Sequence, residues 1–408
     1  MRVLTFTTLY PNNVWPNNGV FIKERVTFFA NLNGVEVKVV APVPYFPDIR
    51  LGSRWRYSQV TSHQLIEGLE VYHPQYFMTP KIGMSFYGLT MFWSVLPVVK
   101  KIQKEFDFDI IDAHYVYPDG YAATLLSNYF KKPVVVSARG SDINLYGEFP
   151  IIRKFLRRTL LKANRVVAVC QALREGIIQL GVPEEKISVI PNGVDSYKFY
   201  PTPKEEVRRK LKLPDKKIIL SVGHLTRNKG FDYLIKALKI LRTDFNQKSV
   251  YLVIVGEGEF RKELEKSISL LNLGEHVRLA GAIPHKEMHD WYSAADLFCL
   301  ASCIEGWPNV ILESLACGTP VVATSAGGIP EIISSNSVGI LAERTEQDIA
   351  QKISIALNKS WNLEEIVKFA ERHAWDQVAL QVFDVFKSVL NNPFPNKFTR
   401  EELERLNP

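Results

Sequence analysis

Short β-branched runs alternate with longer segments of helical periodicity along this chain, and this alternation restricts the fold more than any other feature. Because a helix separates each strand from the next, neighbouring strands should be parallel, with crossover helices. The strands are apolar on both faces, as in sheets that helices cover on both sides. The predicted strands span residues 2–7, 35–41, 110–113, 134–137, 166–169, 187–190, 218–222, 251–255, 277–280, 297–300 and 321–324.

The alternation stops and restarts near Pro191-Asn-Gly-Val-Asp195, where Asn192-Gly193 is a turn signal. A chain of 408 residues is long enough for two domains of this kind. We therefore expect one doubly wound α/β domain over residues 1–197 and a second over residues 198–374. One more helix should cover residues 375–390, followed by a polar tail over residues 391–408.

Two segments interrupt the rhythm of the first domain. Residues 42–70 and 74–83 are rich in proline and aromatic residues, and we expect them to be irregular and to lie over the opening of that domain. Long irregular stretches inside a compact domain are often functional.

Composition favours a soluble protein of a reducing compartment. The four cysteines form no CxxC pair, and no signal peptide is visible at the start. The most apolar segment, residues 84–99, contains a proline and is shorter than the ~18 apolar residues that span a membrane. We expect a cytoplasmic protein, with peripheral contact at the inner face of the cell membrane as an open alternative.

The positive charge lies in the first half of the chain. Residues 1–197 hold 22 Lys and Arg against 16 Asp and Glu, whereas the remainder is nearly balanced. This excess suits an anionic partner such as a phosphate, a lipid headgroup or a nucleic acid, and equally a solvated basic face.

The strongest chemical signal is the segment Glu305-Gly-Trp-Pro-Asn-Val-Ile-Leu-Glu313. A strand should run into it, and a helix should begin near Pro308, because proline needs no amide hydrogen at the first helical position. Free amides at the start of this helix would bind phosphate or sugar oxygens. Those amides belong to Gly306, Trp307, Asn309 and Val310. The alternative is a helix-capping Glu305 and a solvated Glu313.

Further motifs make the signal specific. They are Asn18-Gly-Val-Phe21, Asp112-Ala-His114, Pro191-Asn-Gly-Val-Asp195, Val222-Gly-His-Leu, Lys229-Gly-Phe, Val255-Gly-Glu-Gly258, Cys317-Gly-Thr-Pro-Val-Val-Ala-Thr324 and Gly327-Gly-Ile-Pro-Glu331. With the two glutamates, they resemble the family 4 glycosyltransferases over nearly the whole chain. Ser137-Ala-Arg-Gly-Ser-Asp-Ile-Asn144 is similar to enzymes of bacterial cell-surface polysaccharide assembly.

The resemblance implies the GT-B fold, in which two Rossmann-like domains face each other across a deep cleft. The first domain would bind a glycan or lipid-linked acceptor, and the second a UDP- or GDP-sugar. The last helix would cross back to the first domain. Transfer would retain the anomeric configuration and would need no metal or other cofactor, and no nucleic acid is expected as a partner.

The resemblance also implies roles for single residues. Glu305 would contact the donor sugar near its reacting carbon, Glu313 the ribose hydroxyls and Lys229 the diphosphate. Gly19 would let the backbone approach the same diphosphate, and His114 would make a polar contact with the reacting sugar or the acceptor. The residues from Gly306 to Val310, Pro308 included, would complete the donor site.

Two departures from the family pattern concern charge. Arg139 stands where relatives often have histidine, so with Asp142 we expect it to bind the acceptor, and an anionic acceptor would explain the guanidinium. His224 stands where many relatives have arginine. We expect Arg227 and Lys229 to clamp the diphosphate together, with His224 as a neutral donor. The alternative is a His224 that the phosphates protonate.

Several apparent motifs are set aside. Asp107-Phe-Asp109 has the form of a metal-binding DxD motif but should be a turn before a strand, and Gly256-Glu-Gly258 lacks the third glycine of a dinucleotide site. His285 and His289 have no third ligand nearby and should lie on a solvated helical turn. Two other functions remain open: a nucleotide-sugar epimerase on the same fold, and a non-catalytic sugar- or nucleic-acid-binding protein.

Overall fold

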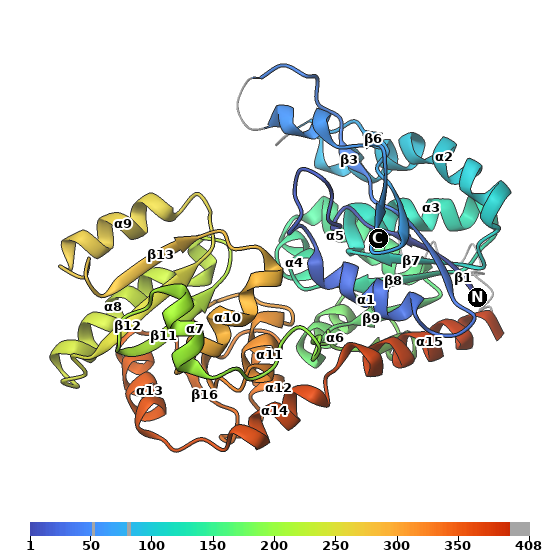
Figure 1. Ribbon diagram of the computed structural model, residues 1–408. Coiled ribbons are helices and arrows are strands. Elements are labelled where there is room, and N and C mark those ends of the chain that lie inside the picture. The colour runs from blue at the N-terminus through green and yellow to red at the C-terminus, as the bar shows by residue number, and fades with distance from the viewer. Residues whose placement is uncertain (51–53, 80–82, 392–408) are drawn as a thin grey trace. The chain divides into compact units, whose positions relative to one another are not determined.

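The computed structural model describes residues 1–50, 54–79 and 83–391, which form two compact units (Figure 1). Unit 1 comprises Met1–Ala168, Arg174–Ile190 and the chain from Ala379 onward, and unit 2 comprises Val169–Leu173 and Pro191–Val378. The tail that the sequence places after residue 391 lies outside the described residues.

Unit 1 is built on an eight-stranded sheet in the order β10-β9-β8-β7-β1-β2-β5-β4. All neighbours in this order are parallel except β4 and β5, so the prediction of a parallel sheet is confirmed for most of it. The strands are β1 (Arg2–Phe6), β2 (Glu36–Val40), β4 (His63–Ile66), β5 (Leu69–Tyr72), β7 (Ile110–His114), β8 (Val134–Ala138), β9 (Arg165–Ala168) and β10 (Ile187–Val189).

Helices connect these strands. They are α1 (Val20–Ala30), α2 (Tyr87–Phe106), α3 (Tyr121–Phe130), α4 (Ser141–Asn144), α5 (Pro150–Lys162), α6 (Gln171–Gln179) and the later part of α15 (Trp375–Asn391), with the short helices η1 (Arg54–Gln59), η2 (Met84–Phe86), η3 (Val116–Gly120), η4 (Tyr146–Glu148) and η5 (Glu184–Lys186). The four strands β1, β7, β8 and β9 are almost fully buried, which is why their sequences are apolar on both faces.

The expectation of an irregular stretch over residues 42–70 is wrong in part. Strands β4 and β5 form an antiparallel hairpin that extends the sheet, and Glu67 and Gly68 make its two-residue turn with φ angles of 48° and 83°. Such turns need positive φ at both central residues. A second, two-stranded sheet pairs β3 (Val43–Pro44) with β6 (Gln75–Tyr76).

Unit 2 contains a six-stranded, fully parallel sheet in the order β13-β12-β11-β14-β15-β16. Its strands are β11 (Lys217–Val222), β12 (Val250–Val255), β13 (Val277–Gly281), β14 (Leu297–Leu300), β15 (Val321–Thr324) and β16 (Gly339–Ala342). Its helices are α7 (Lys204–Leu211), α8 (Phe231–Thr243), α9 (Arg261–Leu270), α10 (Met288–Ala294), α11 (Asn309–Ala316), α12 (Ile329–Ile332), α13 (Glu346–Asn358) and α14 (Leu363–Glu371), with η6 (Arg227–Lys229) and η7 (His285–Glu287).

The junction at Pro191–Asp195 belongs to unit 2. Trp375, at the start of α15, is fully buried there, and a β-carbon at Gly193 would lie within 2.9 Å of it. Backbone hydrogen bonds also join Val194 to His373 and to Trp375. The chain leaves unit 2 within α15, after Val378. Across the described ranges, no helix is long and apolar enough to span a bilayer.

Candidate active site

Loops at the carboxyl ends of the unit 2 strands touch one another through glycines. A β-carbon at Gly256 would lie 1.9 Å from the carbonyl oxygen of Gly223, so the loops after β11 and β12 meet backbone to backbone. Gly327 has a φ of 52°, and its β-carbon would lie 2.0 Å from the carbonyl oxygen of Glu305. Only glycine permits both the conformation and the approach. The loop after β15 therefore supports the backbone of Glu305 directly.

Lys229 and Glu305 form an ion pair. The ammonium of Lys229 donates to Oε1 of Glu305 at 2.6 Å, and the carboxylate is 9% exposed against 23% for the lysine. The two loops also meet through their backbones, because the amide of Cys303 donates to the carbonyl of Asn228. The structure thus brings together the residues expected at the diphosphate and at the donor sugar, although 76 positions separate them.

Helix α11 begins at Asn309, one residue later than expected, because the ψ of 103° at Pro308 is not helical. The side chain of Trp307 is buried, and that of Asn309 accepts from Asn192 and donates to the carbonyl of Gly193. Both side chains therefore contribute to packing and hydrogen bonding within the protein. What this turn offers a ligand is therefore its backbone amides, which a helix of this kind leaves unpaired in its first turn.

Glu313 is not the solvated residue of the alternative reading. Its carboxylate is 9% exposed and accepts a hydrogen bond from the hydroxyl of Tyr292 at 2.7 Å and another from Nε2 of His285 at 2.9 Å. The prediction of a solvated turn is therefore wrong for His285. Sequence reasoning missed both partners, since neither stands in a motif with Glu313. A carboxylate fixed in this way has one defined orientation for a ligand hydroxyl.

His224 and Arg227 lie on the same loop as Lys229, at the carboxyl end of β11, and both are exposed. Nδ1 of His224 donates to the carbonyl of Glu257 at 3.2 Å. The guanidinium of Arg227 lies 5.2 Å from the centre of the Phe260 ring. Both side chains therefore sit where the loops after β11 and β12 meet.

Unit 1 places His114 in a buried cluster of charges at the end of β7. Its ring is 0% exposed, Nε2 lies 2.9 Å from Oδ2 of Asp112, and Nδ1 accepts from the guanidinium of Arg139. Arg25, also buried, approaches Asp112 to 3.5 Å and donates to Oγ of Ser137 at 2.9 Å. Both nitrogens of His114 are engaged by the protein, so this histidine orients Arg139, and its expected contact with a ligand stays a prediction.

Electrostatics fix the protonation states in this cluster. Burial lowers the pKa of His114 to about 3, with Arg139 and Arg25 adding to the effect while Asp112 opposes it. Burial would raise the pKa of Asp112, but His114 and Arg25 lower it to about 2. A neutral His114 that accepts from Arg139 at Nδ1 must carry its proton on Nε2 and donate it to Asp112.

The side chains of Arg139 and Asp142 differ in their charge state and in what they contact. Burial, together with Arg25, lowers the pKa of Arg139 to about 9, so the guanidinium stays charged at neutral pH, and it lies 5.7 Å from the Phe21 ring. The carboxylate of Asp142 is 0% exposed and accepts from the backbone amides of Val116, Arg139 and Gly140. Asp142 therefore holds the loop that carries Arg139, and the expected contact of both residues with the acceptor stays a prediction.

Gly19 precedes helix α1 in the left-handed region, with a φ of 62°, and a β-carbon there would lie 2.2 Å from the carbonyl oxygen of Leu9. The glycine is thus needed for the loop itself, which returns to the end of β1. Gly19 stands two residues before Phe21, whose ring centre lies 5.7 Å from the guanidinium of Arg139. Within unit 1 this loop and the His114 cluster lie at the same edge of the sheet.

The motifs set aside have structural partners. Asp107 pairs with Lys132 at 3.0 Å, and Asp109 accepts from the backbone amide of Arg2, so both belong to the turn before β7. Nε2 of His289 lies near Thr202 and the carbonyl of Tyr200. In the parts of the chain that the structure describes, no three His, Cys, Asp or Glu side chains gather as metal ligands would.

Two families match the chain in succession. Residues 29–197 match Glycosyltransferase Family 4, and residues 203–373 match Glycosyl transferases group 1. A Bacillus subtilis protein named for a glycosyltransferase role in teichuronic acid biosynthesis, TuaC, is 30% identical over 362 residues, or 87% of this chain and 88% of TuaC. The amylovoran biosynthesis glycosyltransferase AmsK of Erwinia amylovora is 26% identical, over 88% of this chain and 91% of AmsK.

Solved structures agree on the fold. Sucrose-phosphate synthase from Thermosynechococcus elongatus superposes with a TM-score of 0.77 at 19% identity, over 96% of this chain and 99% of that one. HepE of Anabaena, solved with UDP, gives 0.72 at 20% identity, over 95% and 100%. The family matches and the fold together therefore define a glycosyltransferase of the GT-B class. The chain belongs to the family 4, group 1 glycosyltransferases, and these matches favour neither an epimerase nor a non-catalytic binder.

The buried neutral His114 gives the protein a testable pH dependence. The unfolded chain binds a proton to this histidine below about pH 6.5, but the folded chain does so only near the lowered pKa of about 3. Stability should therefore fall as pH falls from 6.5. His114→Gln keeps a donor and an acceptor but does not titrate. Between pH 6.5 and 4.5 we expect the wild type to lose about 2 kcal/mol more free energy of unfolding than the variant.

Urea unfolding of both proteins at pH 7.5, 6.5, 5.5 and 4.5 measures this difference. The window stays above the range in which Asp112 titrates, because the pKa of that carboxyl is lowered to about 2. Parallel losses in the wild type and in His114→Gln would contradict the assignment of a neutral, buried His114.

Proposed function

We propose that this glycosyltransferase moves a sugar from a nucleotide-diphosphate-sugar to a saccharide or lipid-linked acceptor, with retention of configuration, in the synthesis of a cell-surface glycan. The observation that carries the proposal is the pair of Lys229 and Glu305 beside the first turn of α11. The names of TuaC and AmsK support the glycan, and the UDP and UDP-glucose found with HepE support the donor.

The departure of the diphosphate from the donor sugar would explain the roles of the site residues in unit 2. When the bond between the anomeric carbon and the diphosphate breaks, negative charge develops on the leaving phosphate. Lys229 would donate to that phosphate together with the amides at the start of α11, and such donors stabilise developing charge most where water is excluded. Glu305 orients the lysine and would accept from a hydroxyl of the donor sugar. Glu313, held by Tyr292 and His285, would accept from the ribose.

Arg227 would add a second cation at the diphosphate. Because His224 already donates from Nδ1 to the carbonyl of Glu257, a neutral ring has no second hydrogen to donate, so the expected uncharged donor does not fit this geometry, and His224 would donate to a phosphate only after the phosphates protonate it. Both side chains are exposed at the carboxyl end of β11, where a donor nucleotide would approach the loop. Cationic side chains and helix amides supply the charge compensation that a metal ion supplies in other phosphate-transferring sites. We therefore propose turnover without a divalent ion.

A donor screen tests this function on the full chain. Thermal unfolding is followed with UDP-, GDP- and ADP-sugars in buffer with EDTA, because a bound donor raises the melting temperature by mass action. We expect one nucleotide-sugar to raise it clearly and to be turned over in EDTA. NMR of the product then gives the anomeric configuration, which should match that of the donor. Inverted product, or activity that only a divalent ion restores, would contradict the proposal.

Substitution of Glu305 tests the centre of the site. We expect Glu305→Gln to lower turnover by about 10²-fold or more while the melting temperature changes little, because the amide cannot pair with Lys229 or accept as strongly. The control is Glu364→Gln, which alters an exposed glutamate paired with Lys368 on α14. Wild-type turnover in Glu305→Gln would reject the role proposed for Glu305.

In the same assay Arg227→Ala should weaken donor binding.

We also propose weak, salt-sensitive contact of unit 1 with anionic membranes. The segment after residue 84 is mostly packed as α2, so most of its apolar residues are not free to insert, but Trp93 on that helix is 67% exposed. At the start of α5, Ile151 is 61% exposed, and Lys154, three residues later on the same helix face, is exposed as well, as is Arg153. Exposed apolar and basic side chains side by side suit an anionic leaflet.

Liposome flotation at low and high salt measures this contact. We expect binding to vesicles with anionic lipid at low salt, and a reduction of roughly tenfold or more when Arg153 and Lys154 are both changed to Glu, since each basic residue near the surface contributes ~1 kcal/mol. Neutral vesicles are the control. Equal binding to neutral and anionic vesicles, or none at low salt, would end the proposal.

A further inference from the structure

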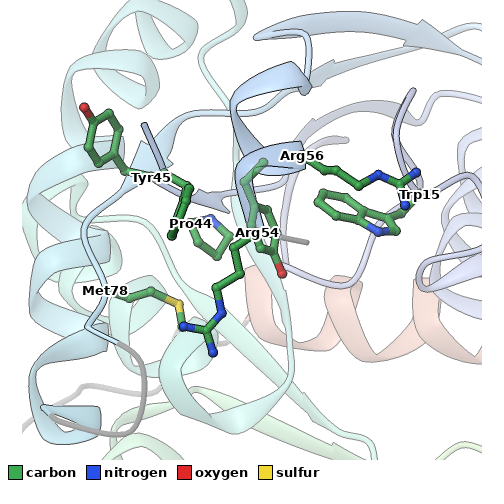
Figure 2. Close-up of a pocket in the computed structure, with 8 residues that line it drawn as sticks. Trp15, Pro44, Tyr45, Arg54, Arg56 and Met78 are labelled. Atoms are coloured by element: carbon green, nitrogen blue, oxygen red, sulfur yellow. The ribbon is translucent and has the colours of Figure 1, made fainter. Parts of the chain in front are cut away.

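Unit 1 contains a concave pocket of about 390 Å³ that none of the motifs indicates (Figure 2). Its volume falls within the roughly 300–1,000 Å³ typical of small-molecule sites. Aromatic rings and two guanidinium groups make up most of its wall. The lining residues are Trp15, Pro44, Tyr45, Phe46, Arg54, Arg56, Tyr57 and Met78.

Topology places this pocket at the functional edge of the sheet. Trp15 belongs to the loop that follows β1, Pro44 and Tyr45 to the segment that follows β2, and Met78 to the segment that follows β5 and β6. These loops extend from the carboxyl ends of parallel strands, and such ends meet at one edge of a sheet, where ligands bind in open α/β folds. His114 and Arg139 stand at the carboxyl ends of β7 and β8. The pocket thus lies at the same edge, over other strands.

Hydrogen bonds fix the walls in place. The side chain of Asn12 is buried and accepts from the amides of Val14 and Trp15, so the loop has one conformation. The side chain of Asn13 donates to the carbonyl of Gln59 at 2.8 Å, which ties the same loop to η1. The rings of Trp15 and Tyr57 then meet with centres 4.5 Å apart. The pocket is therefore formed before any ligand arrives.

Two positively charged side chains line this pocket. Arg54 and Arg56 both belong to the short helix η1. The guanidinium of Arg56 lies 5.8 Å from the centre of the Trp15 ring, and the side chain of Arg54 points toward Met78 (Figure 2). Within the described ranges neither forms an ion pair with a carboxylate. The acidic residue of this segment, Asp48, instead accepts from Ser58 and Gln59. Two guanidinium groups that form no ion pair among the described residues, beside aromatic rings, favour an anion attached to a flat, partly apolar body.

We propose that this pocket is an acceptor subsite for a saccharide unit that carries a negative charge, either a carboxylate or a phosphate; the proposal rests on the glycosyl transfer argued above. The apolar face of a pyranose ring would lie against Trp15 or Tyr57, since an aromatic ring offers a large apolar surface at low entropic cost. Arg54 and Arg56 would bind the anion, and a guanidinium matches carboxylate and phosphate oxygens in pairs. The pocket would receive a part of the acceptor away from its reacting end.

Ligand-detected NMR on the full chain tests the subsite with three probes: methyl glucuronide, glucose 6-phosphate and neutral methyl glucoside. The donor site is filled beforehand with the nucleotide found in the donor screen, so that phosphate cannot bind there. We expect at least one charged probe to bind about tenfold more tightly than the neutral one. A preference for the glucuronide identifies a carboxylate, and a preference for glucose 6-phosphate identifies a phosphate.

Variants locate the binding. In the double variant Arg54→Gln, Arg56→Gln we expect the preference for the charged probe to disappear, whereas Arg50→Gln should keep it. Arg50 is a matched control, because it lies on the same segment over the Trp55 ring and does not line the pocket. Both arginines of the double variant are exposed, and an unchanged melting temperature shows that the fold persists.

The two proposals fail in different ways. Equal binding of charged and neutral sugars, or a preference that survives in the double variant, overturns the subsite even when nucleotide-sugar turnover is normal. Absence of donor binding and turnover overturns the proposed function. The double variant should still show the wild-type thermal shift with the donor nucleotide, because its substitutions lie in unit 1, and loss of that shift would also overturn the subsite as an acceptor site.

Discussion

Close approach of loop backbones at glycines is the constraint on which the site in unit 2 depends. At Gly256 and Gly327, a β-carbon would lie about 2 Å from a carbonyl oxygen of a neighbouring loop, 1.9 and 2.0 Å respectively. Each of these contacts supports one of the two loops, and the loop that carries Lys229 meets the loop that carries Glu305 where a β-carbon at Gly230 would lie 2.2 Å from the carbonyl oxygen of Ala301 and where the amide of Cys303 donates to the carbonyl of Asn228. An ion pair at 2.6 Å between residues so distant in sequence needs such a rigid support.

At the corresponding edge of the sheet in unit 1, a buried cluster of charged side chains takes the place of the glycine contacts. Arg25, Asp112, His114 and Arg139 are all buried, and burial of charge is costly unless the charges are paired and hydrogen-bonded. Asp112 pairs with Arg25 and accepts from the neutral imidazole, which accepts from Arg139, so the charged groups are linked, although Nε and Nη2 of Arg25 and Oδ1 of Asp112 make no hydrogen bond to any described residue. The cluster therefore fixes the direction of Arg139, because the guanidinium donates to Nδ1 of His114.

The sequence predicts the parallel sheets well because buried strands between helices have an unmistakable apolar pattern. It also predicts that Glu305 and Lys229 belong to one site, through the family resemblance. It misses the hairpin of β4 and β5, because the strands around Glu67-Gly68 are short and half-exposed and their alternation is weak. It misses Tyr292 and His285 as partners of Glu313, because tertiary packing joins segments that share no local pattern. It singles out the segments 42–70 and 74–83 that supply most of the pocket around Arg54, but the pocket itself depends on how these segments pack.

The path of α15 has a consequence for the synthesis of the protein. Phe386 on this helix is fully buried in unit 1, with its ring 5.2 Å from that of Phe29, while Trp375 at the start of the same helix is buried in unit 2. Domains generally fold as units, amino-terminal first, while the chain is still emerging from the ribosome. Here the first unit to be synthesised lacks part of its core until α15 has left the ribosome. The second unit can close its own core earlier, so the order of completion is the reverse of the order of synthesis.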